Sequence, residues 1–378
     1  MVHRKSVLAG LSLFLLLLSM YMLKALRDEA AVVAGALQLG QMISLSFAFL
    51  AGMALVIRSL RLENVIGFTL LVVLLLPGIW CSELGLFNPG LATRVIFVSL
   101  GTANLLLISV FWQVVLPGFS RTEAQGAFPF IILLGVLGAI VGPVLNLAVH
   151  SNSLTILSIA TATLLLSATF LRQVRKVPQP SIADQSPQAS QPKKQVNYMG
   201  LLVLIYALLA TVLYAEHIAV VERHQLTSAE RLQFFAKRDL FIALITGLLQ
   251  WWSLRQAKRK HSPKGLLWMP LLTFAVLLTI GLQASLDAVL WGLVLFRSFN
   301  YSFVRPAREL YPFHRRSSLR WKTLIDTVVY RSGDLLGIWL FHSLISLGIS
   351  YFYIALLLIP LLGAWLLINR NIVKTLKT

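Results

Sequence analysis

The two halves of the chain are separated by residues 173–197, which read QVRKVPQPSIADQSPQASQPKKQVN. Proline, glutamine, serine and charged residues replace apolar ones in this stretch, a composition typical of a solvated, disordered linker. The regions on either side are strongly apolar, since the whole chain is 57% hydrophobic and only 12% charged. A soluble domain has no means of burying so much apolar surface. We therefore expect a membrane protein whose halves, residues 1–172 and 198–378, flank a cytoplasmic linker.

Each half contains six apolar segments. A hydrocarbon core about 30 Å thick needs roughly 20 apolar residues per helix, and the absence of water in lipid makes helices the expected spanning structures. The expected spans are residues 6–27, 35–57, 64–84, 95–116, 127–149, 153–171, 198–220, 239–254, 265–284, 286–304, 331–349 and 351–368. The sequence thus predicts an all-α polytopic protein with about 12 transmembrane helices in two six-helix bundles.

Basic residues gather in alternate gaps between these spans. Most of the 33 Lys and Arg lie at the two ends of the chain and in the even-numbered gaps. Cytoplasmic loops carry such an excess, so we expect both termini in the cytoplasm. The net charge of +19 then reflects attraction to anionic lipid headgroups, and nucleic acid is not an expected partner.

Taken as one helix, residues 319–340 place a polar arc opposite an apolar face. The arc consists of Lys322, Thr323, Asp326, Thr327, Tyr330 and Asp334, with Arg331 at its edge. Lys322 and Asp326 are four residues apart, and Arg331 and Asp334 are three apart, so each pair has the spacing of a helical ion pair. The arc is interpreted either as the wall of a substrate cavity or as part of a helix lying at the cytoplasmic interface.

Three further sets of charged residues lie in or beside spans. Arg297 lies inside the tenth span, with Tyr301 one turn later. Its forked guanidinium suits a carboxylate or phosphate, and pairing with an acid of a neighbouring helix explains it equally well. Arg27 and Asp28 close the first span, either as a gate or anion contact or as a solvated helix end. Glu123, before the fifth span, has the same ambiguity.

The segment between the seventh and eighth spans is unusually charged. Residues 216–239 read EHIAVVERHQLTSAERLQFFAKRD. We interpret them either as a long outer loop or as helical extensions of the two spans, with Ser228 as a possible helix cap.

Motifs for catalysis are absent from the sequence. We find no phosphate-cradling glycine loop, no His and Cys spacing for a metal and no nucleophile motif. The sequence predicts neither an enzyme nor a cofactor or metal site.

Four blocks, in order, resemble the nucleotide-transporter (ATP/ADP translocase) family and its bacterial relatives, a branch of the major facilitator superfamily. They are KALRDEAAVVAG (24–35), FWQVVLPGFSRTEAQGAFPFIILLGVLGAIVGP (111–143), LTSAERLQFFAKRDLFIALITGLLQ (226–250) and RPARELYPFHRRSSLRWKTLIDTVVYRSGDLLGIW (305–339). The resemblance implies twelve helices in two bundles, alternating access and a bacterial cytoplasmic membrane.

Carried over residue by residue, the family's functional charges fall on four positions. Its basic residue in the first span falls on Arg27, its glutamate before the fifth span on Glu123, and its glutamate before the eighth span loosely on Glu230. Its lysine near the eleventh span falls on Asp334, which reverses the charge. A carboxylate near tetra-anionic ATP is repulsive, and this departure counts against ATP/ADP exchange.

The leading hypothesis is a secondary active transporter for a small, anionic organic solute. A coupling proton would be carried by Asp334, Asp326 or Glu123. The alternatives are a nucleotide exchanger, or a membrane protein without transport activity that serves as a receptor, handles lipid or assists assembly. A monomer is expected by analogy with the fold alone.

Overall fold

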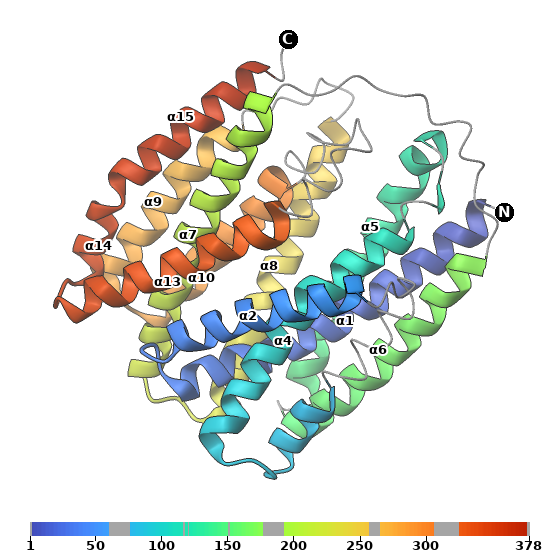
Figure 1. Cartoon of the computed structure of the whole chain (residues 1–378), viewed down its shortest axis with the longest axis horizontal. Helices are drawn as coiled ribbons and strands as arrows, with labels where there is room; N and C mark the ends of the chain where they lie inside the picture. Colours follow the sequence, from blue (N-terminus) through green and yellow to red (C-terminus); the bar gives the residue numbers. More distant parts are fainter. Residues whose placement is uncertain are drawn as a thin grey trace. The chain divides into compact units, whose positions relative to one another are not determined.

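The computed structural model describes residues 2–59, 76–115, 118–119, 121–149, 152–176, 193–256, 265–305 and 325–375. Within these ranges the regular elements are all helical (Figure 1). They are α1 (Val2–Ala34), α2 (Leu39–Ser59), α4 (Pro89–Val115), α5 (Arg121–Ala148), α6 (Ser153–Lys176), α7 (Lys193–Arg223), α8 (Ser228–Gln256), α9 (Gly265–Gln283), α10 (Leu286–Phe299), η3 (Asn300–Val304), η4 (Ile325–Val329), α13 (Tyr330–Ser346), α14 (Tyr351–Leu357) and α15 (Ile359–Thr375).

The predicted spans coincide with these helices. The third span, 64–84, lies mostly outside the described residues, and its described end is helical over residues 76–83. Of the linker, residues 177–192 lie outside the described part, and its two flanks are the end of α6 and the start of α7. The segment 216–239 is not a long loop, because α7 continues to Arg223 and α8 begins at Ser228. The helical-extension interpretation is therefore confirmed.

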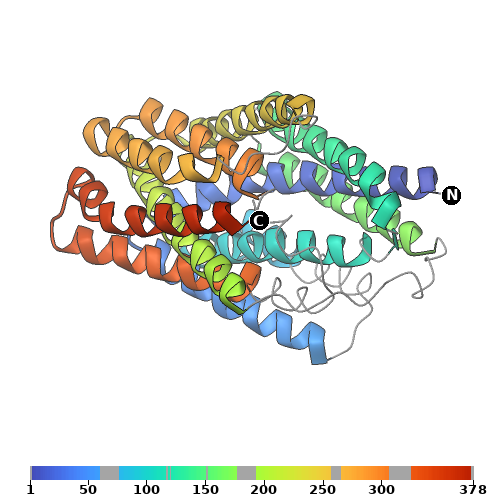
Figure 2. The ribbon, with the colours of Figure 1, turned by 90° about the horizontal axis from the view of Figure 1, so that it is seen from above.

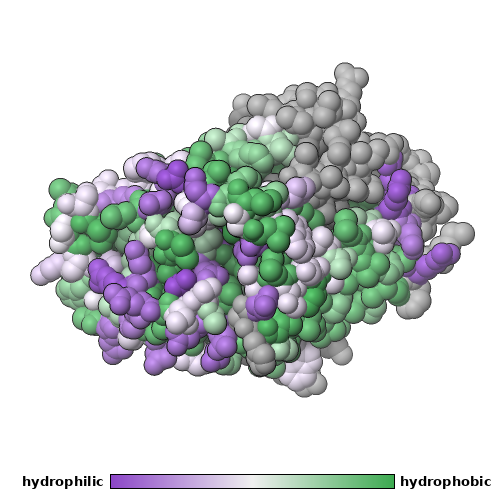
Figure 3. Space-filling view, turned by 90° about the horizontal axis from the view of Figure 1, so that it is seen from below, coloured by the Kyte–Doolittle hydropathy of each residue, from purple (hydrophilic) through white to green (hydrophobic). Residues whose placement is uncertain are grey.

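Six helices in the described ranges are long and apolar enough to cross a membrane, and α14 with α15 makes a seventh if the pair is one bent span. Figure 3 shows apolar side chains over much of one face, and large exposed residues include Leu133 of α5, Trp251 of α8 and Trp339 of α13. Such surface is costly in water and suited to lipid. The chain is a multi-pass membrane protein.

The chain forms two compact units. Unit 1 comprises Met1–Ala34, Ser44–Ser186 and Leu226–Leu240, and unit 2 comprises Gly35–Ile43, Pro187–Gln225 and Phe241–Thr378. Each unit therefore includes a short segment from the other half of the sequence. Each exchanged segment begins next to a residue with positive φ, at Gly35 (87°) and Gln225 (47°).

Unit 1 is organised around α1, which packs against α5, α6 and α4. Figures 1 and 2 show α1 and α5 side by side. Gly138 and Gly142 of α5 face the backbone of α1, where an added Cβ would meet the carbonyl oxygens of Phe14 and Leu18. Small residues let two membrane helices approach closely, so these glycines set the spacing of the pair.

Unit 2 repeats this arrangement around α7, which packs against α13, α15 and α10. Gly333 and Gly337 of α13 lie against the backbone of α7, at Leu204 and Leu208 respectively. In both units the first helix of the six thus packs against the fifth through glycines four residues apart. The six-plus-six organisation with bounds 1–172 and 198–378 stays a prediction.

Two π-helical turns and one bend interrupt the regular helices. Asp326 lies within η4, so residues 325–340 are not one regular α-helix, and the polar arc drawn at 100° per residue is wrong over these residues. Residues 319–324 of the predicted arc lie outside the described part of the chain. A π-turn closes its hydrogen bonds at i to i+5 and shifts the register of every side chain before it. The 42° bend between α14 and α15 lies beside Pro360, which has no N–H to continue the helical ladder.

The glycine contact in unit 2 predicts a steric cost. Gly337→Val places a branched side chain on the Leu208 carbonyl, and overpacking of this kind costs about 1–3 kcal/mol. We expect a lower melting temperature in detergent. Gly363→Val in α15, where an added Cβ meets nothing within 4 Å, is the matched control. Equal melting of the two variants would contradict the close α7–α13 contact.

Candidate functional site

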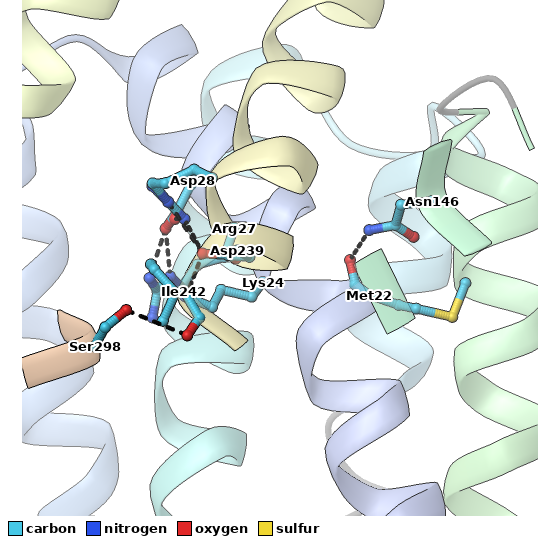
Figure 4. A network of polar contacts seen from close by, with 9 residues as sticks. Met22, Lys24, Arg27, Asp28, Asn146, Asp239, Ile242 and Ser298 are labelled. Carbon is cyan, nitrogen blue, oxygen red and sulfur yellow. Dashed lines mark hydrogen bonds and ion pairs between the residues drawn. The ribbon is translucent and has the colours of Figure 1, made fainter. Parts of the chain in front are cut away.

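A buried guanidinium lies at the centre of a charged network in unit 1. Arg238 of α8 contacts Asp28 of α1 at 2.5 Å and Asp239 at 2.9 Å, and all three residues are fully buried. A buried charge is tolerated only when it is paired and hydrogen-bonded. Figure 4 shows Asp28 and Asp239 close together in this network, with Lys24 and Arg27 beside them. The network joins the end of α1 to the first half of α8.

Two cations of α1 extend the network. Lys24 contacts Asp239 at 2.7 Å, and Arg27 contacts Asp28 at 2.5 Å. Both cations are mostly shielded, with side chains 10% and 17% exposed. Lys24 and Asp28 lie four residues apart on α1, so they project from one side of the helix. Each aspartate is thus bound by one cation from each helix. Asp28 contacts Arg27 and Arg238, and Asp239 contacts Lys24 and Arg238.

A third acidic residue connects the helices nearer their ends. Glu29 of α1 contacts Arg231 of α8 at 3.3 Å and accepts a hydrogen bond from the Ser228 hydroxyl. Including this pair, four cations and three carboxylates meet here, Lys24, Arg27, Arg231 and Arg238 against Asp28, Glu29 and Asp239.

The start of α8 is held by a capping box rather than by Ser228. The Thr227 hydroxyl lies 3.4 Å from the backbone N–H of Glu230, whose carboxylate accepts from the backbone N–H and hydroxyl of Thr227 at 2.8 Å each. This is the reciprocal T-x-x-E pattern. Ser228 cannot serve as the cap because it lies inside α8 and donates to Glu29. Glu230 is exposed and stabilises the helix start that positions Arg231.

A small recess adjoins the network within unit 1. Its lining is Met20, Leu23, Lys24 and Arg27 of α1 with Leu100 and Asn104 of α4. Two cations and one amide thus share a recess whose other lining is apolar. Arg and Lys donate charge-assisted hydrogen bonds to carboxylates and phosphates, so the lining suits an anionic group chemically. In this state the recess has a volume of about 10 Å³, which is room for about one water molecule.

Unit 2 has its own buried pair. Asp334 of α13 accepts from the Thr211 hydroxyl of α7 at 2.8 Å and from Arg331 at 3.0 Å. The predicted pairing of Arg331 with Asp334 is confirmed. Because Asp334 is only 7% exposed, its carboxylate depends on these partners. Its part in a cavity wall stays a prediction.

An aromatic cluster surrounds Tyr206 of α7. Its ring stacks on Phe296 of α10 at 5.8 Å between centroids and lies 6.3 Å from the ring of Tyr330 and 6.1 Å from that of Trp365. Tyr206 therefore links α7 to α10, α13 and α15 by aromatic contact, and such pairs contribute about 0.5–1.5 kcal/mol each. Tyr330, a predicted site residue, belongs to this cluster through Tyr206.

The other predicted residues of unit 2 lie in α10, η3 and η4 or outside the described part of the chain. Arg297 is half-buried near the end of α10, and in the described ranges no acidic side chain pairs with it. Tyr301 lies in η3, where its carbonyl is 3.4 Å from the Gln250 amide. Asp326 lies in η4, and Lys322 lies outside the described residues.

Glu123 lies in the first turn of α5, where a helix dipole favours a carboxylate, and interacts electrostatically with Lys5 of α1. Lys5 and Arg27 are 22 residues apart on one helix, or about 33 Å at 1.5 Å per residue. Glu123 and the charged network therefore lie at opposite ends of α1.

Several residues of these clusters were not among the predicted site residues. They are Lys24, Glu29, Asn104, Thr211, Arg231, Arg238 and Asp239. Arg238 and Asp239 belong to a charged run, AKRD, that reads as solvated. The sequence did contain an indication that these two charges are buried, because they follow Phe234 and Phe235 and precede an apolar segment. Over the described part of the chain, no three His, Cys, Asp or Glu side chains are grouped to hold a metal ion.

Solved membrane transporters have similar structures. A POT family transporter in complex with 5-aminolevulinic acid has a TM-score of 0.62 at 14% identity, covering 97% of this chain and 96% of that one. The human organic anion transporter MFSD10 (TETRAN) has 0.55 at 18%, covering 99% of each. The D-xylose-proton symporter has 0.57 at 11%, covering 98% and 97%.

No family model and no curated protein matches the chain. At these identities the likeness establishes the fold alone. The chain has the all-α fold of major facilitator transporters.

The network predicts that Arg238 is required for stability. Arg238→Met leaves Asp28 and Asp239 with one buried cation fewer, and breaking a buried pair in this way costs about 3–5 kcal/mol. We expect a large fall in melting temperature in detergent, or no folded protein. Lys237→Met, at the exposed neighbouring position, is the control and should melt like the wild type. Similar melting of both variants would show that the network is not stabilising.

The capping box predicts a pH dependence at the start of α8. Hydrogen bonds from Thr227 lower the pKa of Glu230, so its contribution is present above the ordinary glutamate pKa of about 4.3 and is lost as pH falls through the lower, folded-state pKa. Hydrogen exchange over residues 226–235, corrected for intrinsic rates, should accelerate in that acidic window. In Glu230→Gln this acceleration should be absent, and its persistence would assign it to another group.

Proposed function

We propose that the protein is a secondary active transporter of the major facilitator type for a small organic solute with an anionic group. Its halves are residues 1–172 and 198–378, and it works by alternating access, as in transporters built from repeated bundles. The protein works as a monomer in a bacterial cytoplasmic membrane, with both termini on the cytoplasmic side. The observation that carries the proposal is the recess lined by Lys24, Arg27 and Asn104 in a fold of this class.

The charges of unit 1 support an anionic solute. Lys24 and Arg27 both line the recess and both bind aspartates of the network. An incoming carboxylate or phosphate is chemically equivalent to those aspartates as a partner for the cations. It therefore competes with Asp28 and Asp239 for the same donors.

This competition gives the solute a means of changing the conformation. A ligand shifts an equilibrium only by binding one state better than the other. The α1–α8 ion pairs stabilise the state seen here, and an anion that takes over Lys24 or Arg27 weakens them. Gating by Arg27 and Asp28, one of the two interpretations drawn from the sequence, follows from this exchange of partners.

Nucleotide exchange is the less favoured substrate class. Asp334 stands where the resembling family has a lysine, and its carboxylate is already paired with Arg331. A receptor or assembly role has no specific support among the described contacts.

The test is a thermal-shift screen followed by transport. The purified protein in detergent is heated with succinate, phosphoenolpyruvate, inorganic phosphate, ATP or ADP. Glucose and an N-acetylated dipeptide amide, whose two ends carry no charge, are the uncharged comparators. Binding stabilises the folded state by RT ln(1 + [L]/Kd). We expect a small anion to raise the melting temperature and the labelled anion to enter proteoliposomes.

Lys24→Met and Arg27→Met should reduce the ligand-induced shift, whereas Lys237→Met should retain it. Each shift is compared with the same variant without ligand, which separates binding from lost stability. A shift and uptake with glucose or the dipeptide alone would overturn the anionic substrate class. Binding without uptake of any anion would favour a receptor, and a shift and uptake with ATP or ADP alone would restore nucleotide exchange.

A further inference from the structure

One buried carboxyl group plays no part in either charged cluster. Glu216 lies inside α7, the central helix of unit 2, and is 0% exposed. Among the described residues neither of its carboxylate oxygens has a hydrogen-bond partner. It differs in this from Asp28, Asp239 and Asp334, each of which is bound by a cation.

An ionised carboxylate in this position is strongly disfavoured. Moving an unpaired charge out of water costs far more than moving a neutral polar group, and such groups neutralise by taking up a proton. Ionisable residues within membrane helices are expensive to keep and mark ion or proton pathways. A leucine or glutamine at position 216 would avoid that cost. What distinguishes glutamate from both residues is its ability to bind and release a proton.

The charged and titratable groups around α7 identify a route to this carboxyl. On the described elements that pack against α7, or follow them directly, these groups are Asp287 and Arg297 of α10, Tyr330, Arg331, Asp334 and His342 of α13, Tyr351 and Tyr353 of α14, and Arg370 of α15. On α7 itself they are Tyr206, Tyr214, His217, Glu222 and Arg223.

Tyr351 connects the buried carboxyl with the exposed end of α7. Glu216, Glu222 and Arg223 all lie within electrostatic range of its phenol, and the Arg223 guanidinium lies 4.8 Å from its ring centroid. Glu222 and Arg223 are exposed. Asp334 and Arg331 are bound to each other, and His342 is hydrogen-bonded to the Ala36 carbonyl.

We propose that Glu216 is the proton-binding residue of the transporter, loaded from the exposed end of α7 past Tyr351. In the step, hydronium gives one proton to a carboxylate oxygen of Glu216, an O–H bond forms and water remains. The neutral acid fits the dry site of the present state, and the proton leaves when a change of state brings the carboxyl into contact with water or a cation. The coupling role rests on the proposed transport function, whereas proton binding does not.

This assignment replaces the three acids favoured by the sequence. Asp334 is paired with Arg331, which favours its charged form. Glu123 lies in the first turn of α5, where the helix dipole also favours a charge. Asp326 lies in η4, and nothing described there singles it out.

The first measurement is infrared spectroscopy, because a protonated carboxylic acid absorbs at a higher C=O frequency than a carboxylate. At neutral pH we expect a carboxylic acid band that is lost in Glu216→Gln and retained in Glu222→Gln, the matched exposed position on the same helix. Glu216→Asp keeps a carboxyl group and should retain the band at a shifted frequency, which covers the case in which the glutamine variant does not fold. A band unchanged in Glu216→Gln, or equally lost in Glu222→Gln, would overturn the assignment.

The second measurement tests coupling with the anion found in the thermal-shift screen. In proteoliposomes, an imposed pH gradient should drive its accumulation by the wild type. Glu216→Gln should fall to the level seen without a gradient, while exchange of internal for external anion continues. Gradient-driven accumulation that persists in Glu216→Gln would overturn coupling through Glu216. If no anion is transported at all, the proposed function fails, and the infrared band still decides whether Glu216 binds a proton.

Discussion

The guanidinium of Arg238 lies between two carboxylates with no exposure to solvent. A charge in that position is stable only because Asp28 and Asp239 provide opposite charge and hydrogen-bond acceptors together. Lys24 and Arg27 then balance those acids, and both cations also line the recess. This one arrangement fixes the position of α8 against α1 and sets the electrostatics of the recess. The proposed competition by an anionic solute depends on it too.

Packing between the helices follows a different constraint. In lipid there is little hydrophobic driving force for helices to associate, so close packing between backbones has to supply the attraction. Gly138 and Gly142 permit that contact in unit 1, and Gly333 and Gly337 permit it in unit 2. The same pairing of first and fifth helices in both units indicates that the two halves were built on one plan, although their sequences show no visible repeat.

Span positions were predictable because hydropathy depends on residue type and length alone. The site was predictable only where its contacts are local. The Arg331–Asp334 pair follows from i, i+3 spacing on one helix. Arg238 and Asp28 are 210 residues apart in the sequence, and spacing along the chain cannot predict such a contact. The polar arc failed because a helical wheel assumes an uninterrupted α-helix and η4 breaks it. Glu216 and Asp239 are the first and last residues of the charged segment 216–239. The composition of that segment does not show which of its charged side chains are buried.

The exchanged segments restrict how a molecule of this design can move. The chain passes from one unit to the other at five points, near Gly35, Ile43, Ser186, Gln225 and Leu240. If the units move as bodies, each of these points has to act as a hinge, and the one near Ser186 lies outside the described residues. Gly35 and Gln225 lie in short connections and already adopt left-handed backbone. Ile43 and Leu240 lie within α2 and α8. Those two helices must therefore bend as the units rotate, which makes them elastic elements that resist the motion and restore the starting state.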